Sequence, residues 1–174
     1  SIDHATPAVF YAHQPSRNMY HEIGLDLANS DIDFFGGGGF KEPVREDVDV
    51  LEQAKENGFN YINDVDGFIA LQPSDDKILF VNPQLTDGAA MMYSIDQPDD
   101  YITLADITEK AIEYLYNDKG FFMMVEGGKI DWLCHANDAA AMVHEVIDFA
   151  DAVETAIAFA QKHPDETLII ITAD

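Results

Sequence analysis

The residues whose types and positions best suit chemistry are Glu126, Asp131, His135 and Asp174. Glu126 directly follows a run of five apolar residues, and Asp174 closely follows a second apolar run. Asp131 and His135 are four residues apart, a spacing that puts both on one face of a helix. If the apolar runs are neighbouring parallel strands, these groups meet at the carboxyl end of a sheet. Carboxylates and imidazoles bind zinc-type cations, so the pattern predicts a metal site.

Each of these residues also has a simpler interpretation. A lone glutamate such as Glu126 is commonly a solvated loop acid. An aspartate and a histidine at the spacing of Asp131 and His135 commonly form a surface contact. The predicted convergence of the groups therefore carries more weight than any one of them.

A second set of candidate residues lies near the N-terminus. Thr6 precedes Pro7, which is expected to hold it extended, and its hydroxyl could ligate a hard cation. Arg17 is one of two arginines in a strongly acidic chain. A bidentate clamp on a phosphate group is the specific interpretation of this guanidinium. A local ion pair with Glu22 or Asp26 is the simpler one.

Composition restricts the class of protein. The 174 residues carry 33 acids and 9 lysines or arginines, for a formal net charge of −24. This balance argues against nucleic-acid and anionic-lipid partners, which require cationic surfaces. Hydrophobic residues make up 47%, enough for a folded core, and the single cysteine, Cys134, excludes an internal disulfide. No apolar run reaches the roughly 18 residues of a membrane span, and no signal-peptide pattern is present.

Predicted strands and helices alternate along the chain, which indicates a mostly parallel sheet covered by helices on both faces. Residues 82–102 carry turn formers and acids and are predicted to form a loop or insertion. The predicted strands are residues 31–35, 59–62, 77–81, 121–125 and 168–172. The predicted helices are residues 15–29, 47–57, 103–117 and 138–163.

The last helix has the longest apolar periodicity. Its predicted inward stripe consists of Met142, Val146, Ala150, Val153 and Ile157. The helix over 103–117 is expected to start with a capping pair, because Thr103 and Asp106 have the required spacing.

Two blocks of the sequence resemble the alkaline phosphatase family. The resemblance covers nearly the whole chain and implies a three-layer α/β/α sandwich with a mostly parallel sheet, as one partial catalytic domain over residues 1–174. The C-terminal block comprises Phe121–Asp131, His135–Asp138 and Thr167–Asp174. The N-terminal block comprises His4–Ala8, Ser16–Asn18 and the glycines after Phe35.

The resemblance implies two zinc ions and one magnesium ion in the parent protein. Asp131 and His135 match two ligands of the first zinc. Asp174 matches a ligand of the second zinc. Thr6 and Glu126 match two magnesium ligands.

Three further residues receive roles from the same resemblance. Arg17 matches the arginine that binds the substrate phosphate. His4 falls at a position in the second shell of magnesium, and Trp132 at a position close to the phosphate. Both positions vary in the family and tune the surroundings of the metals and the phosphate.

The implied activity is hydrolysis of phosphate monoesters through a phosphoserine. The nucleophilic serine of the family, an aspartate that bridges two metals, and two histidine ligands have no counterpart in these residues. We therefore expect a segment of a larger enzyme that is inactive alone. The family also implies a homodimer that is periplasmic or secreted, and the open sheet edges of a segment would favour self-association.

Two other functions stay open at this stage. A sulfatase, phosphodiesterase or phosphomutase of the same superfamily would share the sheet and the metal cage. A non-enzymatic acidic domain that binds metal ions or a cationic partner would explain the charge. That last hypothesis leaves the positions of Glu126, Asp131, His135 and Asp174 unexplained.

Overall fold

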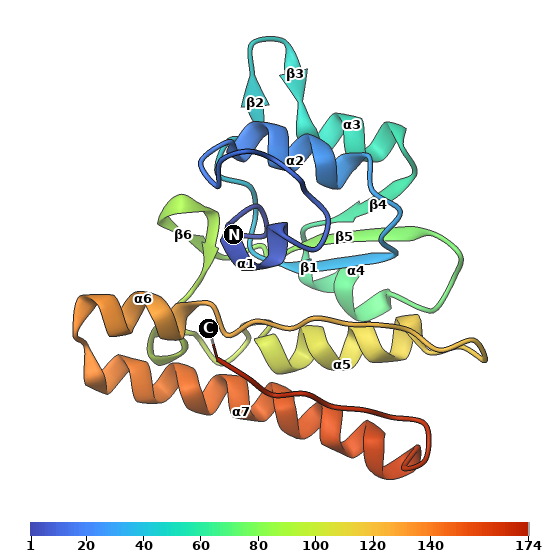
Figure 1. The fold of residues 1–174 in the computed structure, drawn as a ribbon, viewed down its shortest axis with the longest axis vertical. Coiled ribbons are helices and arrows are strands. Elements are labelled where there is room, and N and C mark those ends of the chain that lie inside the picture. The colour runs from blue at the N-terminus through green and yellow to red at the C-terminus, as the bar shows by residue number, and fades with distance from the viewer. Residues whose placement is uncertain (174) are drawn as a thin grey trace.

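The centre of the molecule is a three-stranded parallel sheet. The computed structural model describes residues 1–173 and places the strands in the order β1 (Phe34–Gly37), β5 (Lys77–Val81) and β4 (Phe59–Ile62) (Figure 1). Phe35 and Tyr61 both pair with Leu79, from opposite sides. The strands predicted over 59–62 and 77–81 are confirmed, and the first strand begins three residues later than predicted.

Helices precede, follow and connect these strands. None of those among the described residues is long and apolar enough to cross a membrane. They are α1 (Ala5–Ala8), α2 (Tyr20–Ala28), α3 (Val50–Glu56), α4 (Val65–Ala70), α5 (Leu104–Leu115), α6 (Lys129–Ala136) and α7 (Ala139–Lys162). The shorter elements are β2 (Val44–Arg45), β3 (Val48–Asp49), β6 (Leu85–Thr86), β7 (Ala90–Met91), and the 3-10 turns η1 (Asp87–Ala89) and η2 (Ser94–Asp96).

Strand β5 supplies both hydrophobic cores because its side chains alternate across the sheet. Leu79 and Val81 pack in one core with residues of α2 and α3. Ile78 and Phe80 pack in the other core with residues of α4 and α5. Helices thus cover both faces of a parallel sheet, and the predicted α/β class is confirmed.

Side-chain caps set several helix boundaries. The predicted capping pair is present: Thr103 Oγ1 accepts from the Asp106 backbone, and an Asp106 carboxylate oxygen accepts from the Thr103 N–H at 2.8 Å. The helix predicted over 15–29 begins only at Tyr20, because Ser16 Oγ and the Asn18 N–H form a local turn instead.

The two apolar runs predicted as buried strands, residues 121–125 and 168–172, do not form strands. They run as extended chain outside the sheet (Figure 1). Their side chains are partly or largely exposed, with Phe122 at 77% and Leu168 at 83%. An apolar run favours extended backbone, but a buried strand also needs hydrogen-bonding neighbours and covered faces. Nothing in the sheet formed by the described residues pairs with them.

The predicted inward stripe of α7 is also wrong at three of its five positions. Val146, Ala150 and Ile157 are exposed, whereas Met142 and Val153 are half-buried. The buried face of α7 instead consists of Ala141, Glu145 and Ala152. The alanines allow a close approach to α5, and the Glu145 carboxylate accepts a hydrogen bond from the Ser94 N–H at 2.7 Å. Packing against α5 and the hydrogen bond from Ser94 therefore bury this face of α7, although the predicted stripe is more apolar.

Asp148 lies on α7 close to acids of the same helix and of α5. Burial is the largest cause that raises its pKa to about 6, and the charges of Glu145, Asp151 and Asp106 add to it. Because this pKa lies above the value of 3.8 for a free aspartate, the folded state favours the protonated carboxyl group. The contribution of Asp148 to stability is greatest at low pH and is lost as the pH rises through 6.

Asp148→Asn should therefore raise the free energy of unfolding near pH 8, where the wild-type carboxylate is charged and partly desolvated. The gain should disappear below about pH 4, where aspartate is protonated in both states. Urea unfolding of both proteins across this range measures the difference. Asp165→Asn, in the exposed turn after α7, is the control, and a pH-independent effect of Asp148→Asn would contradict the assignment.

Candidate active site

The glycine-rich stretch after β1 holds the N-terminal segment at the carboxyl end of the sheet. The Ile2 N–H donates to the Gly39 carbonyl at 3.1 Å, and the Gly39 N–H donates to the Ala89 carbonyl at 2.8 Å. A Cβ on Gly38 would lie only 2.6 Å from that carbonyl oxygen. Glycine is therefore required here for the close approach of three backbone segments.

Asp3 anchors the start of this segment, and no sequence pattern predicted this role. Its side chain is fully buried, and one carboxylate oxygen accepts from the Lys41 N–H at 2.6 Å. Burial raises its pKa, although the Lys41 N–H acts in the opposite direction. The only signal in the sequence was its position directly before the block His4–Ala8.

His4 is the centre of a cluster of predicted site residues. Its Nε2 lies 3.4 Å from Nη2 of Arg17, and its ring meets the edge of Trp132 with 5.8 Å between centroids. Burial, followed by the charges of Lys41 and Arg17, lowers the pKa of His4. Because a guanidinium only donates hydrogen bonds, the neutral imidazole accepts from Arg17.

Tyr20 and Lys41 extend this cluster, and neither was predicted. The Tyr20 ring stacks on His4 with centroids 6.1 Å apart. Lys41 Nζ lies 4.4 Å from the centre of the Tyr20 ring and 3.3 Å from its hydroxyl. Lys41 thereby adds a second positive charge near Arg17, held by a cation–π contact.

Among the described residues, the distribution of ion pairs leaves two cations near His4 without a carboxylate partner. Arg45, Lys55, Lys77 and Lys110 each pair with a carboxylate. Within residues 1–173, Arg17 and Lys41 form no such pair. The local ion pair that was the simpler interpretation of Arg17 is not formed. Glu22 pairs with Arg45 instead, and Asp26 accepts a hydrogen bond from Gln14 at 2.7 Å.

Helix α6 presents the predicted carboxylate and imidazole on one face. Asp131 Oδ1 and His135 Nε2 lie 3.4 Å apart, and both side chains are exposed. The charge of Asp131 acts on His4, which places α6 beside the cluster. Two such donors fit a zinc ion. Among residues 1–173 no group of three or more histidine, cysteine or acidic side chains gathers to hold a metal ion.

The other predicted metal ligands are Glu126, Thr6 and Asp174. Glu126 is half-buried before α6, and its charge acts on the amino group of Ser1. Thr6 lies inside α1, so the prediction that Pro7 holds it extended is wrong. Proline is tolerated in the first turn of a helix, and this short helix has little more than one turn. Asp174 lies outside the described residues.

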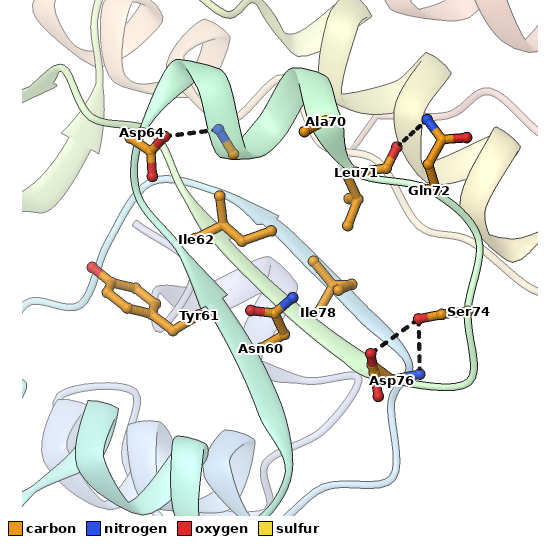
Figure 2. A pocket seen from close by; sticks show the side chains of 11 residues that line it. Asn60, Tyr61, Ile62, Asp64, Ala70, Leu71, Gln72, Ser74, Asp76 and Ile78 are labelled. Carbon is orange, nitrogen blue, oxygen red and sulfur yellow. Dashed lines mark hydrogen bonds between the residues drawn. The ribbon is translucent and has the colours of Figure 1, made fainter.

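A cavity lies away from these residues. It has a volume of about 420 Å³ and lies between β4, α4 and the connection to β5 (Figure 2). The Asp64 carboxylate at its wall accepts from the Gly67 N–H, and the Ser74 hydroxyl donates to Asp76. These groups satisfy one another and include no predicted site residue. This cavity is therefore separate from the cluster around His4.

A parallel α/β sheet with an arginine that has no carboxylate partner among the described residues, and a carboxylate–imidazole pair beside it, is the arrangement expected of a class of α/β proteins that bind anions at the carboxyl ends of their strands. A family model described as "Alkaline phosphatase" matches residues 1–174. The chain belongs to the alkaline phosphatase family.

Individual relatives agree with this assignment. Over 99% of the length of this chain, it is 37% identical to alkaline phosphatase 3 of Bacillus subtilis and 30% identical to the alkaline phosphatase of Escherichia coli. The alkaline phosphatase of the Antarctic bacterium TAB5 superposes with a TM-score of 0.80 at 38% identity, covering 94% of this chain. A mutant of that enzyme was solved with magnesium in its M3 site.

The chain spans less than half the length of these relatives. It covers 37% of the Bacillus enzyme, 46% of the Escherichia enzyme and 47% of the TAB5 chain. A cold-active Shewanella alkaline phosphatase, with a TM-score of 0.81, is covered to 39%. The activity of a whole enzyme is therefore a separate question from family membership.

We predict that the 174-residue chain binds zinc weakly, because Asp131 and His135 supply only two donors where zinc sites use four ligands. His135→Ala should abolish this binding in calorimetry. His144→Ala, which removes an exposed histidine of α7, should leave it unchanged. Tight binding of three metal ions per chain would contradict the prediction.

Proposed function

We propose that this chain carries the phosphate-binding residue and part of the metal-binding residues of an alkaline phosphatase that hydrolyses phosphate monoesters. The main support for this proposal is the position of Arg17. Its guanidinium lies 3.4 Å from His4 and is free of carboxylate partners within the described residues, whereas the other arginine, Arg45, is paired twice.

The proposed roles follow the chemistry of the side chains. Arg17 binds two oxygens of the phosphate, because a guanidinium donates two parallel hydrogen bonds. His4 accepts a hydrogen bond from Arg17 and so orients it. Trp132 packs against His4 and shields one side of the site.

The proposed metal ligands are Asp131 and His135 for one zinc ion, Asp174 for a second, and Thr6 and Glu126 for magnesium. When bound, these ions supply positive charge for the phosphate and activate the attacking oxygen. The acids that make the chain negative are in part those that would hold the cations, which reconciles an anionic substrate with the net charge.

We also propose how this chain relates to an active enzyme. The serine nucleophile implied by the family has no counterpart among the 174 residues, so the chain alone is inactive. The complete enzyme is a homodimer exported to the periplasm or outside the cell. A chain with open sheet edges at β1 and β4 self-associates at high concentration.

Arg17→Ala should weaken binding of inorganic phosphate to the chain by about tenfold or more, since a charge-assisted hydrogen bond contributes roughly 1.5–3 kcal/mol. Arg45→Ala is the matched control, because it removes the same charge from a residue paired with Glu22 and Glu42. Phosphate titration followed by NMR measures both. Equal losses in the two variants would show that only net charge matters.

The chain alone should not hydrolyse an aryl phosphate, even with zinc and magnesium present, because the attacking serine is absent. Release of the aryl alcohol, followed by absorbance, tests this. Robust turnover that disappears in Glu126→Ala would overturn the proposal that the chain is inactive by itself.

A further inference from the structure

We infer that Lys129 is a positioning residue of the proposed zinc site. Its buried ammonium group fixes the first turn of α6 against Tyr93 of the 82–102 segment. Because α6 carries Asp131 and His135, the orientation of these two side chains depends on this contact. The inference rests on the proposed function for the role of Asp131 and His135, but the contact can be tested independently.

Few side chains anchor α6. Lys129 is 8% exposed and Leu133 is 5% exposed, and the other residues of the helix are half-buried or exposed. One of the two anchors is therefore a charged side chain. Burial of an ammonium group is unfavourable unless other groups stabilise the charge, so its surroundings decide whether the helix is held.

The surroundings of Lys129 are aromatic. Its Nζ lies 3.5 Å from the centre of the Tyr93 ring and 5.5 Å from that of Trp132. It also donates to Thr86 Oγ1 at 3.4 Å. In the part of the chain that the structure describes, no carboxylate forms an ion pair with it. The faces of two aromatic rings thus stabilise the cation, and the nearer ring belongs to the 82–102 segment.

A second buried charge, on α7, also contacts the 82–102 segment. Glu145 of α7 is 6% exposed and accepts from the Ser94 N–H at 2.7 Å. Burial lowers the pKa of Lys129, and the charge of Glu145 acts in the opposite direction. Neighbouring residues Tyr93 and Ser94 therefore contact buried charges of α6 and α7. Through the contacts of Tyr93 and Ser94, the 82–102 segment positions α6.

Lys129→Met tests the inference, because methionine keeps an unbranched side chain of similar length and removes the charge. Lys119→Met is the matched control, since Lys119 is exposed and lies outside the helices. Three measurements on the full chain are compared: hydrogen exchange of the α6 amides, zinc affinity by calorimetry, and fluorescence emission. Trp132 is the only tryptophan, so the emission reports on this contact directly.

In Lys129→Met we expect faster exchange in α6, a shifted Trp132 emission and about tenfold weaker zinc binding, the size of effect seen for residues that orient metal ligands. Lys129→Arg, which keeps the charge, should leave α6 exchange, Trp132 emission and zinc affinity close to their wild-type values. Electrostatics alone predicts the opposite sign for zinc, because loss of a nearby positive charge would strengthen cation binding. Stronger or unchanged zinc binding, or unchanged α6 exchange, would overturn the inference.

Tyr93→Leu provides a second variant in case Lys129→Met fails to fold. It should reproduce the effects of Lys129→Met, and the double variant should add little, because both changes remove the same contact. Fully additive effects would refute the contact. If the wild-type chain shows no zinc binding through Asp131 and His135, the zinc assignment of the proposed function fails, and α6 exchange still decides whether Lys129 anchors the helix.

Discussion

The parallel pairing of β5 with β1 and β4 is the interaction on which the rest of this structure depends. Hydrogen bonds on both edges fix the strand, and its alternating side chains supply the centre of both hydrophobic cores. The same pairing aligns the carboxyl end of β1 with Val81 of β5. The glycines that follow β1 then approach the N-terminal segment closely enough to hold it by backbone hydrogen bonds. These backbone hydrogen bonds determine the position of His4, and His4 in turn contacts Arg17.

A second constraint is electrostatic. A net charge of −24 leaves few cations, and within the described residues four of the nine lysines and arginines pair with nearby carboxylates. Among the cations without a carboxylate partner in the described residues, Arg17 lies next to a histidine, and Lys41 and Lys129 lie over aromatic rings. Rings stabilise a cation without neutralising it. The charges of Arg17 and Lys41 therefore remain available to an anion, which suits the proposed phosphate site in an otherwise acidic protein.

Local signals predicted much of this fold correctly. The strands β4 and β5 and the Thr103 capping pair depend on neighbouring residues, and all were confirmed. The spacing of Asp131 and His135 likewise determined their common face, because helical periodicity is a local property. Tyr20, Asp3 and Lys41 were missed because their contacts, Tyr20 with His4 and Lys41 with both Tyr20 and Asp3, join residues far apart in the sequence. The metal, phosphate and neighbouring roles assigned to the site residues all stay predictions.

The sequence by itself determined the α/β class, the family and the helical pairing of Asp131 with His135, because each depends on short-range pattern or on motif. Only the tertiary structure decided which face of α7 is buried. Hydrophobicity favoured the stripe through Val146 and Ile157, but Glu145 and two alanines face the neighbouring elements instead. It also decided that residues 121–125 and 168–172 form no strands. A strand is a property of a pair of segments, and an apolar run specifies only one member of that pair.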